Sequence, residues 1–124
     1  MLILIEPYGQ LANRLFMMAH AIASAKHHGF QVKVYNFSEY AHDFDIKPLQ
    51  EVYTLMTDAK VVRRVTFGYK LLKKLHLLWI LPKFHQGYYT QGKLTQEFFD
   101  KVSHKKMYLM DWSFRDESSF ILYR

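Results

Sequence analysis

The residues with the clearest chemical potential follow the first apolar run of the chain. The apolar run is residues 2–5, LILI, and Glu6 follows it. Gly9 and Asn13 lie where a helical pattern begins. A glycine lets the backbone approach a ligand closely. The first turn of a helix offers unpaired N–H groups and a positive dipole end to an anion such as phosphate, and Asn13 would reach the same ligand. The spacing alone favours a simpler interpretation, in which Gly9 only makes the turn and Asn13 only caps the helix.

Two strands and a helix position these residues. Residues 2–5 predict a strand covered on both faces. Apolar residues at every third or fourth position predict the helix, which ends at a basic last turn and Gly29. They are Leu11, Leu15, Met18, Ile22 and Ala25. Alternation over residues 31–37 predicts the second strand. The unit is therefore βαβ, and its first turn is expected at the carboxyl edge of a sheet, where ligands of open α/β folds bind.

Other candidates for chemistry are weaker. Residues 38–49 hold four residues of metal-ligand type, which are Glu39, His42, Asp43 and Asp45. Acidic turn residues are more often solvated than metal-bound, so we interpret this stretch as an exposed loop and predict no metal site. Glu6 and Asp111 each follow a predicted strand and fit either a catalytic acid or a solvated sheet edge. No Ser–His–Asp set can be assembled from the sequence, so the catalytic residues stay unassigned.

Length and composition bound the class of protein. With 124 residues and a hydrophobic content of 50%, the chain is expected to fold as one domain with a buried core. It has no cysteine, which excludes disulfides, thiolate zinc sites and a cysteine nucleophile and fits a reducing cytosol. The N-terminus is a poor signal peptide, and residues 75–82, the longest uncharged apolar stretch, are too short to span a bilayer. We therefore expect a cytoplasmic protein.

The positive charge lies in the middle of the chain. Residues 1–59 carry four basic and six acidic residues, a net of −2, and residues 97–124 carry five of each. Residues 60–96 carry eight basic residues and no acidic residue, so the net charge of +6 comes from this segment alone. Such an asymmetry indicates an anionic partner. The segment has no RNA-binding signature, and we expect no nucleic-acid partner.

Within the basic segment, residues 67–84, FGYKLLKKLHLLWILPKF, predict an amphipathic helix that Pro82 ends. Phe67, Leu71, Leu75, Leu78 and Trp79 share one face. The candidate cations of a polyanion or membrane surface lie opposite or beside it, and they are Lys70, Lys73, Lys74 and Lys83. The commoner arrangement would turn the apolar face to the core and the lysines to solvent. The alternative is a basic helix that lies on the inner face of an anionic membrane.

Three further patterns predict elements of the remaining chain. They are a helix from residue 59 capped by Asp58, a short helix through residues 97–99 begun by Thr95 or Thr90, and a strand over residues 105–112. Residues 86–92, QGYYTQG, predict a loop.

The stretch YGQLANRLFMMAHAIASAKHHGFQV resembles the opening of family 11 glycosyltransferases, the α-1,2-fucosyltransferase-like proteins. In that family the first strand is followed by the signature G-[GR]-L-G-N-Q-[ML]-F-x-x-A. The residues that match are Gly9, Leu11, Asn13, Leu15, Phe16 and Ala19. Ala12 replaces the second glycine and Arg14 the glutamine. Residues 39–44, EYAHDF, and residues 111–116, DWSFRD, are similar to a bacterial branch of the group.

The resemblance implies an α/β fold, a Rossmann-like parallel sheet with flanking helices, similar to the N-terminal domain of a two-domain GT-B glycosyltransferase. Such enzymes transfer fucose from the nucleotide sugar GDP-fucose to a glycan acceptor hydroxyl, with inversion and without a metal or further cofactor. By resemblance, Gly9 and Asn13 approach the donor diphosphate. Arg14 either adds a charge-assisted contact to that diphosphate or marks a different donor or acceptor.

The family also carries a histidine–x–arginine donor motif in its second half, and no such triplet occurs in this chain. We therefore expect residues 1–124 to form a single acceptor-side domain without the donor-binding domain. Such a domain is inactive alone or depends on a second polypeptide that carries the donor half. The alternative from a different class is a non-catalytic module that docks on an anionic membrane or a lipid-linked glycan through the basic helix, residues 60–83.

Overall fold

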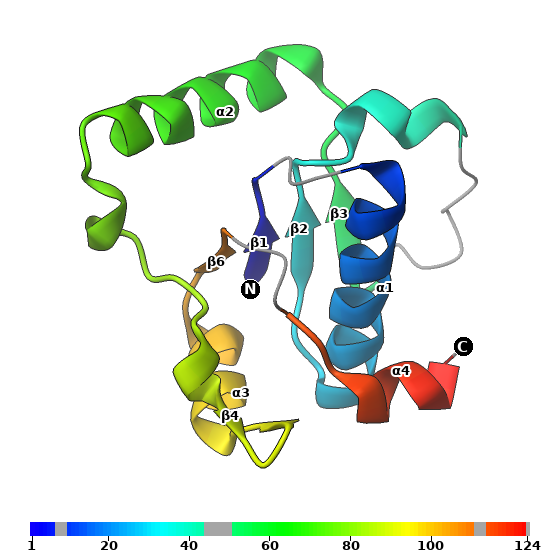
Figure 1. Ribbon diagram of the computed structural model, residues 1–124. Coiled ribbons are helices and arrows are strands. Elements are labelled where there is room, and N and C mark those ends of the chain that lie inside the picture. The colour runs from blue at the N-terminus through cyan, green and yellow to red at the C-terminus, as the bar shows by residue number, and fades with distance from the viewer. Residues whose placement is uncertain (7–9, 44–50, 111–113, 124) are drawn as a thin grey trace.

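A parallel β-sheet forms the centre of the molecule. The computed structural model describes residues 1–6, 10–43, 51–110 and 114–123. The sheet has four parallel strands in the order β3-β2-β1-β6 (Figure 1). They are β1 (Leu2–Leu4), β2 (Val32–Val34), β3 (Tyr53–Leu55) and β6 (Met107–Leu109). The chain is thus α/β with a parallel sheet flanked by helices, an arrangement compatible with a Rossmann-like fold.

The βαβ unit predicted from the sequence is confirmed. Strands β1 and β2 pair in parallel, with Leu2 opposite Val32. Helix α1 (Leu11–His28) connects them, and the predicted apolar stripe packs on the Leu2 and Leu4 side of the sheet. Gly29 ends the helix with a φ of 76°, a left-handed conformation that glycine adopts without strain, and its N–H donates to the Ala25 carbonyl.

Helix α2 (Ala59–Lys74) packs on the opposite side of the sheet. Ile3 and Ile5 alternate with Leu2 and Leu4, so they point away from α1 and contact the α2 side together with Tyr35 and Tyr69. Asp58 caps α2 as predicted, because its carboxylate accepts hydrogen bonds from the N–H groups of Lys60 and Val61.

The prediction of one helix that continues to Pro82 is wrong. Helix α2 ends at Lys74, and His76 adopts a positive φ of 57° before a short 3-10 helix, η3 (Leu78–Ile80). The turn lets Leu78 pack against the sheet, and a straight helix would carry the chain away from it. Partial burial of Leu78 therefore stabilises a break that the apolar periodicity did not predict.

The core-facing orientation of the apolar stripe is also wrong. Phe67 is 67% exposed and Trp79 is 75% exposed, and Leu71 and Leu75 are exposed as well. The α2 residues that face the sheet are instead Val61, Val62, Val65 and Tyr69. The face that packs on the sheet combines three short β-branched valines with the ring of Tyr69, a shape that permits close packing.

A small hairpin and helix α3 lead to the fourth strand of the sheet. Residues 86–92, predicted as a loop, instead contain η4 (Gln86–Tyr88) and β4 (Tyr89–Thr90), which pairs with β5 (Lys93–Leu94). The two turn residues, Gln91 and Gly92, both have positive φ, which suits a two-residue hairpin. Thr95, not Thr90, caps α3 (Gln96–His104). The strand predicted over residues 105–112 is present as β6 (Met107–Leu109). Residues 111 and 112 of that prediction lie outside the described residues.

Two short elements complete the fold. The 3-10 helix η1 (Ser38–Asp43) follows β2 and lies beside the start of α1 (Figure 1). Helix α4 (Glu117–Tyr123), which no pattern predicted, packs against α1. Within the described residues, no helix has both the length and the apolar character needed to cross a bilayer.

Candidate functional site

Strand ends, helix starts and η1 meet at the carboxyl edge of the sheet. The end of β1 leads to Glu6 and the end of β2 to Asn36, and α2 passes across this edge in Figure 1. A cavity of 510 Å³ opens between η1 and the first half of α2. A smaller hollow of 170 Å³ adjoins it and reaches the start of α1. The two share four lining residues, Ser38, Glu39, Val62 and Thr66, and we call them together the edge groove.

Asn13 occupies the first turn of α1 and does not cap it. The helix begins at Leu11, and Gln10 is the N-cap residue, with an extended backbone and no side-chain cap hydrogen bond. The N–H of Asn13 already donates to the Gln10 carbonyl at 3.0 Å. The capping interpretation is therefore wrong, and the Asn13 side chain is exposed. Gly9, its predicted companion at a donor diphosphate, lies outside the described residues.

Arg14 forms the inner wall of the edge groove. Its side chain is 12% exposed, and its Nη1 donates to the Asn36 carbonyl at 3.2 Å and to the Glu39 carboxylate. Its guanidinium also lies over the Tyr40 ring, 5.6 Å from the ring centroid. These contacts fix η1 against the start of α1. The charge of Arg14 is therefore countered by Glu39, and any anion in the groove would compete with that carboxylate.

A second set of contacts ties α2 to the end of β1. The Nζ of Lys73 lies 2.9 Å from Glu6 Oε1. Buried Asn36 donates from Nδ2 to the Glu6 carbonyl at 2.9 Å. Because Glu6 and Lys73 are far apart in sequence, no local pattern could have paired them. Asn36 was missed because a lone amide at a strand end carries no signal by itself.

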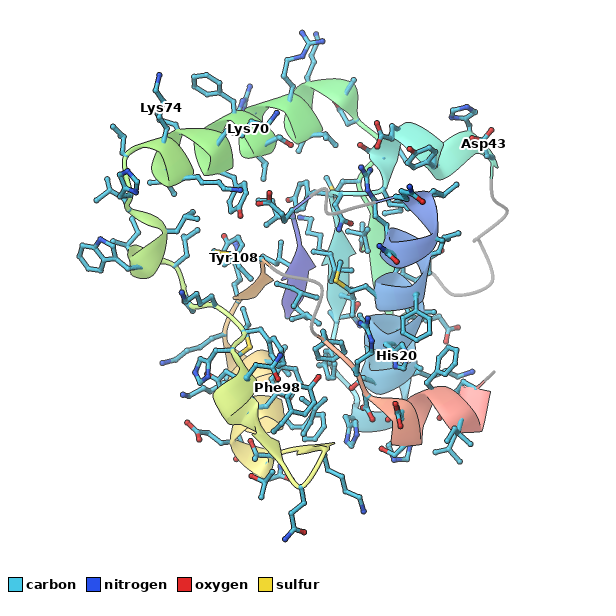
Figure 2. The ribbon with its side chains drawn as sticks, viewed as in Figure 1. His20, Asp43, Lys70, Lys74, Phe98 and Tyr108 are labelled. Atoms are coloured by element: carbon cyan, nitrogen blue, oxygen red, sulfur yellow. The ribbon has the colours of Figure 1, made fainter. Side chains whose placement is uncertain are left out.

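The four lysines predicted as one surface are divided among different regions. Lys73 points to the sheet edge and pairs with Glu6. Lys70 lines the edge groove. Lys74 points outward from α2, away from the sheet (Figure 2). Lys83 lies beyond η3, where its backbone forms a parallel bridge with Tyr108 of β6. Of the four, Lys70 and Lys74 share the exposed side of α2.

The lining of the edge groove is mixed in chemistry. Phe67 supplies an apolar ring surface, and hydroxyl groups come from Ser38, Thr57 and Thr66. The ionic members are Glu39, Arg14, Arg63 and Lys70. Apolar walls with a few convergent donors and acceptors are typical of small-molecule sites. Among the described residues, no group of three His, Asp or Glu side chains is arranged to hold a metal ion.

A separate polar cluster lies buried between α1 and α4. His20 Nδ1 accepts a hydrogen bond from the Asp116 N–H at 3.2 Å, and the His20 ring stacks on Phe120 with centroids 4.4 Å apart. Figure 2 shows His20 on α1 beside α4. Burial lowers the pKa of His20. None of these residues lines the edge groove. Their contacts hold α4 on α1.

The ionisation of Asp116 results from opposing effects. Burial disfavours the charged carboxylate, but nearby donors outweigh burial and hold the pKa of Asp116 below its usual value. These donors are the Ser24 hydroxyl, close by without a well-formed hydrogen bond, the Ser119 N–H at 3.2 Å and the Ser118 hydroxyl at 2.8 Å. Burial also lowers the pKa of His28, whose Nε2 lies 3.7 Å from Asp116 Oδ2.

No protein-family model, curated protein or solved structure matches the chain.

Proposed function

We propose that the chain is the acceptor-side half of a fucosyltransferase-like glycosyltransferase of GT-B type, and that its edge groove binds a glycan acceptor. The observation that carries the proposal is the position of the groove. It lies at the carboxyl edge of a parallel sheet, adjacent to the helix start that bears the residues resembling the family 11 signature. This edge is where open α/β sheets bind their ligands.

The groove chemistry suits a sugar. A pyranose ring has an apolar face of C–H groups that can rest on an exposed aromatic ring such as Phe67. Its hydroxyl groups can donate to Glu39 and exchange hydrogen bonds with Ser38 and Thr66. These residues come from η1 and α2, and the Arg14–Glu39 pair holds η1 in position.

The proposed reaction divides the work between two halves. The oxygen of the acceptor hydroxyl attacks the anomeric carbon of fucose and its proton is released to solvent, while the bond from that carbon to GDP breaks and GDP leaves with the bonding electrons. The present chain orients the acceptor, and Asn13 at the first turn of α1 contacts the donor diphosphate together with Gly9 and Arg14. A second polypeptide grips the remainder of the nucleotide.

Glycan binding by the isolated chain tests the acceptor site. We expect glycans that end in an unsubstituted sugar to bind on an array, and the selected glycan to be confirmed by calorimetric titration. Arg63 lines the groove, whereas neighbouring Arg64 is exposed and outside the lining. Arg63→Ala should weaken binding roughly tenfold, the cost of one charge-assisted hydrogen bond, and Arg64→Ala should leave it unchanged. Equal affinity for wild type and Arg63→Ala would reject the groove as the acceptor site.

The donor contact is tested separately with the second polypeptide added. Titration of GDP-fucose should show weaker binding to Asn13→Ala than to wild type. Equal and measurable affinities would remove Asn13 from the donor site.

A further inference from the structure

Helix α2 and η3 leave a row of large apolar side chains uncovered. The row consists of Phe67, Leu71, Leu75, Trp79 and Ile80, and we call it the outer stripe. Phe67 and Leu71 lie on the side of α2 opposite to Val65 and Tyr69, which pack on the sheet, and Leu75 follows as the C-cap residue. Exposed apolar residues are usually scattered, so five of them gathered on α2, its C-cap and η3 mark a contact surface.

Positive charge accompanies the outer stripe. Arg63, Arg64, Lys70 and Lys74 are exposed on the same helix, and residues 60–96 contain no acidic residue. Among the described residues, no carboxylate forms an ion pair with Lys70 or Lys74. Lys73, the cation nearest the sheet, is the one that pairs with Glu6. The charge beside the stripe is therefore available to an anionic partner.

The composition favours lipid over protein as that partner. The centres of protein–protein interfaces are depleted of lysine, whereas helices that lie on membranes combine lysine and arginine with leucine, phenylalanine and tryptophan. Tryptophan is enriched where acyl chains meet headgroups, and Trp79 is 75% exposed.

We propose that the outer stripe docks the protein on the surface of an anionic phospholipid bilayer. Leu71, Leu75 and Trp79 enter the boundary between headgroups and acyl chains, and the basic side chains of Arg64 and Lys74 extend to the lipid phosphates. The surface goes beyond the proposed glycan site and does not depend on it. Phe67 belongs to both the edge groove and the outer stripe, and Lys70 of the groove lies on the same helix, so the docked protein would hold its groove next to the membrane.

Vesicle sedimentation tests the proposal with phosphatidylcholine vesicles prepared with and without phosphatidylglycerol. We expect the wild-type chain to pellet with the anionic vesicles and to be released as salt rises, because screening shortens the reach of the lipid surface charge. In a Trp112→Phe background, the emission of Trp79 should shift to shorter wavelength on binding, since its ring leaves water.

Matched variants distinguish binding through the outer stripe from nonspecific adsorption to vesicles. Leu75→Ser with Trp79→Ser should reduce partitioning at least tenfold. Ile121→Ser with Leu122→Ser removes two apolar residues of α4 that are also more than half exposed and should not reduce partitioning. Arg64→Gln with Lys74→Gln should reduce partitioning roughly thirtyfold, at about one fivefold step per cation. Lys93→Gln with Lys106→Gln removes the same charge elsewhere and should have a smaller effect.

Three outcomes would overturn the proposal. They are no sedimentation with anionic vesicles, equal binding of wild type and the Leu75/Trp79 variant, and a stripe-dependent dimer in solution that does not bind vesicles. The last result would assign the stripe to a second copy of the chain. Circular dichroism of each variant confirms that the fold is kept, and none of these readouts involves glycan or GDP-fucose.

Discussion

Helices α1 and α2 lie on opposite faces of one sheet and differ in what covers their outer sides. From Met17 to Ala25, helix α1 is packed between the sheet and α4, so even His20 and Ser24 are buried there, whereas Phe16 nearer its start is exposed. In α2, Tyr69 is the only buried residue, and large apolar residues face outward. A helix enclosed on both sides serves the stability of the fold. The apolar side of α2 is uncovered among the described residues, and we propose it as a contact surface.

The largest difference is expected from a charge placed on each helix. Ala21 on α1 is fully buried, so Ala21→Asp should destabilise the fold by more than about 3 kcal/mol or prevent folding. Leu71→Asp on α2 should change the free energy of unfolding by less than about 0.5 kcal/mol, because Leu71 is exposed. Urea unfolding followed by circular dichroism measures both. A large loss of stability for Leu71→Asp would show that the outer stripe is part of the core.

Acidification should weaken the packing of α4 on α1 and so reduce the difference in burial between α1 and α2. The pKa values of His20 and Asp116 are both lowered in the folded protein. The unfolded chain therefore binds more protons as pH falls, and stability present above about pH 6.5 is lost on acidification through the folded pKa of His20. Asp116 adds a second loss below about pH 4.

Thermal unfolding as a function of pH measures this effect. His20→Gln keeps a hydrogen-bond acceptor but cannot titrate, so the decrease in Tm between neutral and mildly acidic pH should be smaller than in wild type. His104→Gln, a change at an exposed histidine on α3, should retain the wild-type decrease. An unchanged decrease in His20→Gln would place the acid sensitivity elsewhere.

The smallest expected difference concerns the helix starts. Asp58→Ala removes two hydrogen bonds to the first turn of α2 and should cost about 1 kcal/mol. Gln10→Ala at the start of α1 removes no side-chain cap hydrogen bond and should cost a few tenths of a kcal/mol, roughly. Urea unfolding again gives the comparison. Equal costs would mean that the α1 start depends on Gln10 in another way.

Local signals accounted for much of the fold. Gly29 ends α1, Asp58 caps α2 and Thr95 caps α3, as predicted, because each depends on residues within one helical turn. The break at His76 was not predicted, since it depends on Leu78 reaching the sheet. Helix α4 was missed for the same reason, as its residues are held by contacts with α1.

The candidate site was predicted only in part. The position of Asn13 and Arg14 near the sheet edge followed from the βαβ pattern. The edge groove itself did not, because its walls come from η1 and α2, which are separated in the chain. The ion pairs of Arg14 with Glu39 and of Lys73 with Glu6 join residues 25 and 67 positions apart. In each pair the carboxylate counters the positive charge, so an anionic ligand would have to compete with it.

The sequence by itself determined the parallel βαβ opening, the glycine that ends α1, the Asp58 cap of α2 and the concentration of positive charge in residues 60–96. These properties depend on hydrogen bonds within one turn, on the period of apolar residues or on composition. Only the tertiary structure decided which face of α2 meets the sheet and which of its lysines are neutralised. Two faces of one helix can both be apolar enough to be buried. The shape of the sheet determines which of the two faces packs against it.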